Sequence, residues 1–456
     1  MIDVGARNLS KRIWAGFLLE CILLVGSVPI LYLMDLSWMT VVALAMLACT
    51  WVVRRVTIGV WFQPTPVDLL LILFFVFLIP LSIWASPPTL RPIYTLPRAM
   101  ILLWNGAAFS TIVTYGANHH RLRQLAISGL ILIGVGLALV APLGMNWLYK
   151  IGVLRPILSR IPSVLVGIFQ GAESGFHPNQ VAGTLLYILP HCCGFLLASI
   201  FFTRWAILWR SSQFWLITLA TGIMSITFLL TQSRSGILAF AFSLLCLLVI
   251  LSVYHWRSRA VVALILTFGL IGVFVTQEGI LGQITELAID FLRVTPAGLT
   301  SHTLQQFRVE IWTYAIAALH DFSVTGMGLG TFRELVRILY PITITPSYDI
   351  AHAHNIFMQA GLDFGLLGMA VLLALYLSGL VASISLIRQN VSTANRAWGC
   401  GFIMALIAQM SYGLLDTVAM GSKTNIVFWY FFAVLFGLFL NAHKKKKHYA
   451  NTNLSA

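Results

Sequence analysis

The stretch "AHAHNIFMQAGLDFGLLGMAVLLALYLSGLVASISLI" at residues 351–387 joins two histidines and an asparagine to an almost uninterrupted apolar run. A helix that crosses the hydrocarbon core of a bilayer needs roughly 20 mostly apolar residues. The run from Ile356 to Ile387 meets that requirement and predicts a membrane-spanning helix. His352, His354 and Asn355 stand directly before this helix, where polar side chains cost more to bury than a leucine would.

The composition of the whole chain agrees with this first helix. Of the 456 residues, 59% are hydrophobic and 9% are charged, which is typical of a polytopic membrane protein and excludes a soluble globular domain. The formal charge is +14, but the basic residues are scattered in pairs and form no stripe for nucleic acid. The six cysteines all lie within apolar runs and have no zinc-site spacing.

About twelve segments have the length and composition of a membrane-spanning helix. They are approximately residues 13–34, 37–53, 67–85, 98–116, 125–141, 178–202, 213–231, 235–254, 260–277, 355–387, 397–415 and 424–441. Basic residues fall on alternate connections between these segments: Lys11 and Arg12, Arg54 and Arg55, Arg121 and Arg123, Arg204 and Arg210, Arg257 and Arg259, Arg388 and Arg396, and Lys444 to Lys447. Because positive loops mark the cytoplasmic side, we predict an all-α polytopic membrane protein with both termini cytoplasmic.

This topology divides the chain into four parts. Transmembrane helices 1–9 are predicted in residues 1–277, a long extracytoplasmic loop in 278–354, helices 10–12 in 355–441 and a basic cytoplasmic tail in 442–456. Long loops are usually functional, and the stretch "FRVEIWTYAIAAL" within this one has helical patterning. We therefore expect a small helical subdomain on the outer membrane surface.

Two arginines on the predicted extracytoplasmic face are candidate functional residues. Arg234 lies in "TQSRSG" (231–236) between two apolar runs, and an arginine at membrane depth costs roughly 3 kcal/mol. The alternative is that Arg234 lies in an interfacial turn and extends to lipid headgroups. Arg308 lies in "FRVEIW", one helical turn before Trp312, whose ring could stack on the guanidinium. The alternative for Arg308 is the solvated face of an amphipathic loop helix.

His354 is the candidate general base. The ordinary pKa of a histidine, near 6.5, suits proton transfer at neutral pH, although a histidine at a helix start can also cap the helix or bond the nearby backbone. Asn355 adjoins His354 as a candidate supporting residue. His352 is either a partner of His354 or an ordinary loop residue.

The sequence "FHPNQ" at 176–180 begins another predicted span on the same face. Pro178 suits the first turn of a helix, and His177 and Asn179 flank it. We favour a role in helix entry for both, and a share in the site remains open.

No pair of acidic residues has the spacing that would hold a divalent metal for phosphate chemistry. We predict neither a metal nor another cofactor. "GMGLGTF" at 326–332 resembles a glycine-rich phosphate loop only superficially, since it follows no predicted strand. We interpret it as a flexible turn.

These candidates combine into one chemical hypothesis. Arginines can hold a diphosphate through charge-assisted, bidentate hydrogen bonds, while His354 takes a proton from an attacking hydroxyl. A stabilised leaving group and a positioned base are the minimum requirements for glycosyl transfer from a lipid diphosphate without a metal.

Several motifs and their order resemble the O-antigen ligase and O-antigen polymerase superfamily. They are "QSRSG" at a tight outer turn, "FRVEIW" in a long loop, "FSVTGMGLGTF" with Ser323 and Val324 where proline is common, and "HAHNIFMQAGLDFGLLG" leading into a span. The resemblance covers roughly residues 176–415, and the first five spans match only in being apolar.

The resemblance implies a GT-C-type membrane glycosyltransferase in the bacterial inner membrane, with its active site on the periplasmic face. It would take a glycan from undecaprenyl diphosphate and, as an O-antigen ligase, pass it to a hydroxyl of lipid A-core in lipopolysaccharide biosynthesis. The family's diphosphate-binding arginines fall on Arg234 and Arg308, and its catalytic histidine falls on His354.

Three alternatives remain open. A polymerase would pass the glycan to a second lipid-linked repeat, a secondary transporter would bind its solute near the bilayer midplane, and a scaffold would have no activity of its own. The sequence gives neither the sugar nor the oligomeric state.

Overall fold

The computed structural model describes residues 2–33, 38–144, 177–254, 304–344, 350–388 and 392–454. Within these ranges every regular element is a helix. Ten of the helices are long and apolar enough to cross a membrane. The prediction of an all-helical, multi-pass chain is therefore confirmed for the part of the chain that the structure describes.

The elements follow one another in a simple order. They are α1 (Ile2–Leu33), α2 (Trp38–Ile58), α3 (Asp68–Ile72), η1 (Leu73–Leu78), α4 (Ile79–Ala85), η2 (Arg91–Thr95), α5 (Leu96–Asn118), α6 (His120–Gly144), α8 (Pro178–Phe202), α9 (Trp205–Trp209), α10 (Ser212–Leu230), α11 (Arg234–Tyr254), α14 (Leu304–Asp321), α15 (Phe332–Leu339), α16 (Ile356–Arg388), α17 (Thr393–Gly413), η6 (Lys423–Asn425) and α18 (Ile426–Leu454).

Ten of the twelve predicted spans correspond to these ten apolar helices, with ends that agree within a few residues except where α3, η1 and α4, or η2 and α5, join into one span. The predicted span 260–277 lies outside the described residues. The predicted span 397–415 corresponds to α17, which is a helix but is not among the ten. Its Gln409 amide is buried and donates to the carbonyl of Gly183, so α17 carries polar groups that neighbouring helices satisfy.

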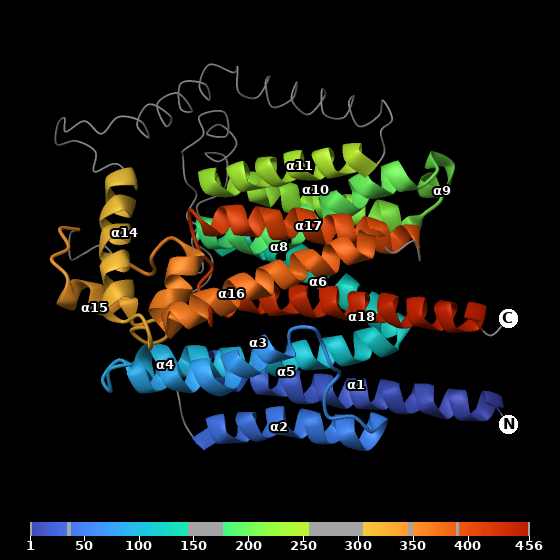
Figure 1. Ribbon diagram of the computed structural model, residues 1–456, viewed down its shortest axis with the longest axis horizontal. Coiled ribbons are helices and arrows are strands. Elements are labelled where there is room, and N and C mark those ends of the chain that lie inside the picture. The colour runs from blue at the N-terminus through green and yellow to red at the C-terminus, as the bar shows by residue number, and fades with distance from the viewer. Residues whose placement is uncertain are drawn as a thin grey trace, which may run out of the picture.

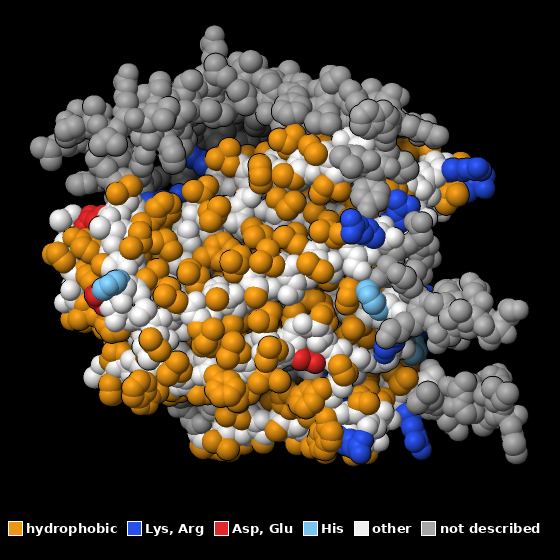
Figure 2. All heavy atoms as spheres, in the orientation of Figure 1, with side chains coloured by type: hydrophobic (Ala, Val, Ile, Leu, Met, Phe, Trp, Pro, Cys, Tyr) orange, Lys and Arg blue, Asp and Glu red, His pale blue; other side chains and the backbone are white. Residues whose placement is uncertain are grey.

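The long helices lie roughly side by side, and the N- and C-termini lie at the same end of the bundle (Figure 1). α14 stands across the opposite end, next to α15 (Figure 1). Figure 2 shows that apolar side chains cover most of one face, while many of its lysines and arginines lie near the end that holds the termini. This distribution is what a bilayer-spanning bundle requires.

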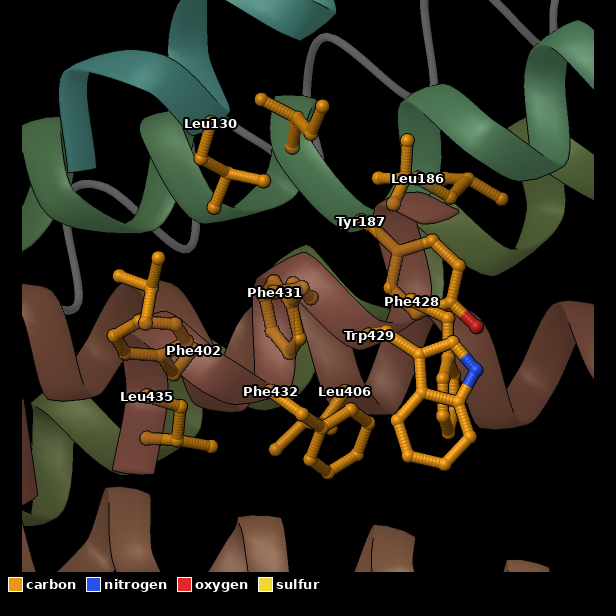
Figure 3. Packing of buried hydrophobic residues seen from close by; sticks show 14 of the residues in the cluster. Leu130, Leu186, Tyr187, Phe402, Leu406, Phe428, Trp429, Phe431, Phe432 and Leu435 are labelled. Carbon is orange, nitrogen blue, oxygen red and sulfur yellow. The ribbon is translucent and has the colours of Figure 1, made fainter. Parts of the chain in front are cut away.

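Aromatic side chains fill the centre of the bundle, where α8, α17 and α18 meet (Figure 3). Trp429, Phe428 and Phe431 are almost fully buried, and the hydroxyl groups of Tyr187 and Tyr376 satisfy one another at 2.8 Å. α8 and α17 also approach closely, since a Cβ at Gly194 would lie only 2.8 Å from the Cα of Gly401. Small residues permit such close helix contacts in membranes.

One buried ion pair lies between the first helices. The guanidinium of Arg54 donates to both carboxylate oxygens of Glu20, and both side chains are fully buried. Thr111 and Tyr115 donate further hydrogen bonds to the same carboxylate. Arg54 therefore lies within α2 and joins it to α1. The topology prediction had counted it among the loop residues.

Candidate functional site

The chain enters α16 through a turn that the asparagine of the "HAHN" sequence closes. The Asn355 side-chain oxygen accepts from the backbone N–H groups of Phe357 and Met358, each at 3.0 Å, which is the geometry of an N-cap. Its amide nitrogen donates to the carbonyl oxygen of Leu414 at 3.2 Å. Asn355 thus fixes the start of α16 against the end of α17.

A second loop packs against α16 a few residues after this turn. Residues 326–330, the glycine-rich loop, are buried, and Met327 N–H donates to the carbonyl of Leu362 at 2.7 Å. Gly330 N–H donates to the carboxylate of Asp363 at 2.9 Å. The loop is therefore ordered by hydrogen bonds to α16, and its interpretation as a flexible turn was wrong.

α16 is broken at Gly365, nine residues after its first residue, Ile356. This glycine has φ 77° and ψ 178°, a conformation that is open to glycine and strained for other residues. A Cβ there would collide with the carbonyl oxygen of Val324. The N–H of Leu366, freed by the break, donates to the carbonyl of Ser323 at 2.7 Å.

His354 is held in an unusual backbone conformation. Its φ of 50° lies in the left-handed region, which few residues other than glycine and asparagine adopt. Its ring Nδ1 lies 3.1 Å from Oδ1 of Asp416. Because a carboxylate only accepts hydrogen bonds, Nδ1 carries the proton in this contact, and Nε2 is left as the acceptor of the neutral ring.

Asp416 is the centre of the site, and sequence reasoning missed it. It lies just beyond α17 with its side chain 1% exposed, and it accepts from Asn179 at 2.9 Å and from the N–H of Thr417 at 2.9 Å. Nη2 of Arg308 lies 3.7 Å from Oδ2 of Asp416. One carboxylate thus joins residues of α8, α14 and the turn before α16. The signal was present, since Asp416 directly follows a predicted span on the same face as His354.

The charge state of Asp416 follows from these partners. Burial alone raises the pKa of its carboxyl, but the hydrogen bond from His354 and the favourable electrostatic interactions of the carboxylate with His354, His352 and Arg308 outweigh that effect. The pKa of Asp416 is therefore lowered below its ordinary value, and the residue is a carboxylate at neutral pH.

His352 packs behind His354. Its Nδ1 accepts from the backbone N–H of His354 at 3.2 Å, and the two rings lie 4.4 Å apart. Burial lowers the pKa of His352, as do the nearby charges of His354, His177 and Arg98, while Asp416 opposes them. His352 is thus neutral in the folded protein.

Replacement of His352 by asparagine should flatten the acid dependence of stability. Below pH 6.5 the unfolded chain protonates this histidine and the folded chain does not, so the free energy of unfolding falls as the pH falls. Asparagine can still accept from His354 N–H, and at pH 5.5 it should remove about 1 kcal/mol of that loss. Thermal unfolding of the detergent-purified wild-type protein and variant at pH 7.5 and 5.5 measures this change in stability. An unchanged difference between the two pH values would show that His352 protonates in the folded state.

Arg308 and Trp312 lie on α14 but do not stack on one another. The indole N–H of Trp312 donates to the carbonyl of Ala353 at 2.9 Å, and the described residues show no ring contact between Trp312 and the guanidinium. The stacking that the spacing allowed is not found there, because the indole is bonded to the histidine turn instead. Arg308 is 28% exposed and faces Asp416.

Arg234 makes none of these contacts, and His177 caps α8 beside Asn179. Arg234 is the first residue of α11, after the tight turn that includes Gln232 with φ 51°. Its side chain is exposed and makes no hydrogen bond or ion pair with the described residues. The ring of His177 accepts from the N–H of Asn179 at 3.3 Å and so caps α8. The structure thus brings His354, Arg308 and Asn179 together through Asp416, and leaves Arg234 outside that cluster.

By distance alone, three of these side chains could hold a metal ion. Ligand atoms of His352, His354 and Asp416 lie within 4.8 Å of one another. The guanidinium of Arg308 already places a fixed positive charge 3.7 Å from Asp416, which disfavours a second cation there. The group is better suited to orienting a base.

Fold and site together define a multi-pass helical membrane protein with a polar, charged site where several helices end. Residues 219–373, from α10 into α16, match the family model described as O-antigen ligase. The predicted resemblance to the O-antigen ligase superfamily is thereby confirmed for this segment, which includes Arg234, Arg308 and His354. No curated protein matches the chain.

Proposed function

We propose that the protein is an O-antigen ligase: a membrane glycosyltransferase of GT-C type that moves a glycan from undecaprenyl diphosphate to a hydroxyl of lipid A-core without a metal. The observation that carries the proposal is the joining of His354 and Arg308 by one buried carboxylate. The family match to residues 219–373 supports the same class of reaction.

In the proposed reaction, Nε2 of His354 accepts the proton of the acceptor hydroxyl. The hydroxyl oxygen then forms a bond to the anomeric carbon of the donor sugar, and the bond from that carbon to the diphosphate breaks. Asp416 keeps the Nδ1 proton in place and stabilises the imidazolium that forms. Arg308 stabilises the diphosphate as it leaves, with Arg234 as a second candidate for that task.

We further propose that the site lies on the periplasmic face of the bacterial inner membrane and that both termini are cytoplasmic. The arrangement in Figure 1 supports this, because the termini lie at one end of the bundle and α14, which carries Arg308, lies at the other. The transporter alternative requires a polar site near the bilayer midplane. The His354 cluster lies instead where α16 begins, α17 ends and the chain turns towards α18.

Alanine substitution of the two arginines tests the leaving-group assignment. Arg308→Ala should lower kcat/KM by about 10²-fold because it removes a positive charge from the departing diphosphate. Arg308→Lys should recover only part of this loss, since lysine lacks the bidentate fork. Arg234→Ala should give a comparable loss if Arg234 also contacts the diphosphate.

The measurement is transfer by the purified protein from a lipid diphosphate-linked glycan, with lipid A-core and a second lipid-linked repeat offered as separate acceptors. Arg388→Ala serves as the matched control, because Arg388 is an exposed arginine at the other end of α16. Formation of lipid A-core product supports the ligase, and chain extension supports the polymerase. Full activity of Arg308→Ala would remove Arg308 from the site.

A further inference from the structure

A cavity of about 380 Å³ lies beside His352. Its walls come from the start of α5, the turn before α16 and the segment that leads into α18. They include Arg98 of α5, Arg333 of α15, His352 in the turn and Lys423 of η6.

The charge of this cavity has one sign. Arg98, Arg333 and Lys423 line it, and none of the lining residues that the structure describes is an aspartate or glutamate. Nη1 of Arg98 is buried and has no hydrogen-bond partner among the described residues. A buried donor without a partner is rare and costly, and the anionic oxygens of a ligand would satisfy it.

Two glycines pack against Arg98, Gly330 against its guanidinium and Gly421 against its Cβ and main chain. Gly330 and Gly421 have φ of 77° and 72°. A Cβ at either position would collide with atoms of Arg98. The backbone thus packs directly against this arginine, and the site is built around its guanidinium.

The segment after Gly421 adds to the positive potential. Ser422 precedes the short helix η6, and α18 follows it at once with 29 residues. The N-terminal end of a helix carries a partial positive charge that favours anions. Lys423 is exposed at this end and lines the cavity.

The cavity contacts His352, and the Asp416 cluster contacts His354, the other member of the histidine pair. His352 lines the cavity, and its Nδ1 accepts from the backbone of His354. The ring of His354 binds Asp416, which also faces Arg308. Cationic side chains thus line a cavity at His352, while Arg308 lies beside Asp416, and a transfer reaction has two substrates to place.

We propose that this cavity binds a phosphate group on the sugar portion of the acceptor glycolipid and so holds the acceptor hydroxyl near His354. The inference rests on the proposed function, in which the donor diphosphate occupies the Arg308 side. The volume falls within the range of small-molecule sites, roughly 300–1,000 Å³. Charge-assisted hydrogen bonds from arginine and lysine supply the recognition.

The test measures binding without donor, so that it is independent of transfer. The full chain in detergent is titrated with lipid A-core and with the same glycolipid after enzymatic dephosphorylation. Lys423→Gln and Arg333→Gln should each raise the Kd for the phosphorylated form about tenfold, the loss of one charged hydrogen bond. Both variants should leave the Kd for the dephosphorylated form and for the lipid-linked donor unchanged. Arg388→Gln is the control for net charge.

Three outcomes would overturn the proposal. They are equal binding of the two acceptor forms by the wild-type protein, weakened binding of the donor in place of the acceptor, and equal competition by phosphatidylglycerol vesicles, which would assign the cavity to bulk lipid headgroups. Lys423 is exposed, so its variant separates loss of binding from loss of folding. A wild-type protein that binds the phosphorylated acceptor but transfers nothing would contradict the proposed function and leave this site in place.

Discussion

Replacing His354 with asparagine is expected to lower kcat for glycan transfer by about 10³-fold, the contribution of a positioned general base. The proposed reaction needs Nε2 of this histidine to accept the hydroxyl proton, and asparagine offers no group of suitable basicity. Asparagine is the sharper substitution here because the backbone of His354 has a φ of 50°. Asparagine enters that region at lower cost than alanine does.

The measurement is kcat under saturating donor and acceptor, together with thermal unfolding of the same preparation. His320→Asn is the matched control, because His320 lies on α14 with a side chain that is 91% exposed. An unfolding temperature close to that of the wild-type protein would show that the loss is chemical. Transfer at a rate near that of the wild-type protein would remove the base assignment.

The helices were predictable because each depends on the length of one apolar run. A span such as 178–202 agrees with α8 to the residue. α17 was predicted on the same grounds, although its surroundings differ: it contacts α8, α11 and α16 and carries buried polar groups that these neighbours satisfy. Local hydropathy therefore locates the helices well and says little about which of them lie at the centre.

The site was predictable only in part, because its residues meet through tertiary contacts. His354 and Arg308 could be proposed from their motifs, but Asp416, which joins them, lies 62 residues beyond His354 along the chain. Trp312 was assigned to the wrong partner, since spacing along a helix cannot show that Ala353 offers its carbonyl to the indole. Arg98 could not be identified as a candidate from the sequence, because its position in the cavity depends on glycines from two distant loops.

Asp416→Asn is expected to lower kcat by at least about 10²-fold, since an acid that fixes the tautomer of a catalytic histidine contributes on that scale or more. The substitution keeps the shape of the side chain and removes its charge. An amide that donates to Nδ1 of His354 would force the proton onto Nε2, and the ring could then no longer accept the hydroxyl proton there. The loss of charge also leaves Arg308 without the carboxylate that faces it.

The pH dependence separates this role from a merely structural one. The pKa of Asp416 is lowered, so the wild-type carboxylate keeps its charge as the pH falls to 5 and contributes no loss of activity there. The asparagine variant should remain slow at every pH from 5 to 9, because raising the pH cannot restore the missing carboxylate. Asp321→Asn is the control, as Asp321 is an exposed acid on α14. A variant whose kcat stays within threefold of the wild-type value would show that His354 is oriented without Asp416, and the assignment of Arg308 would then have to stand on its own.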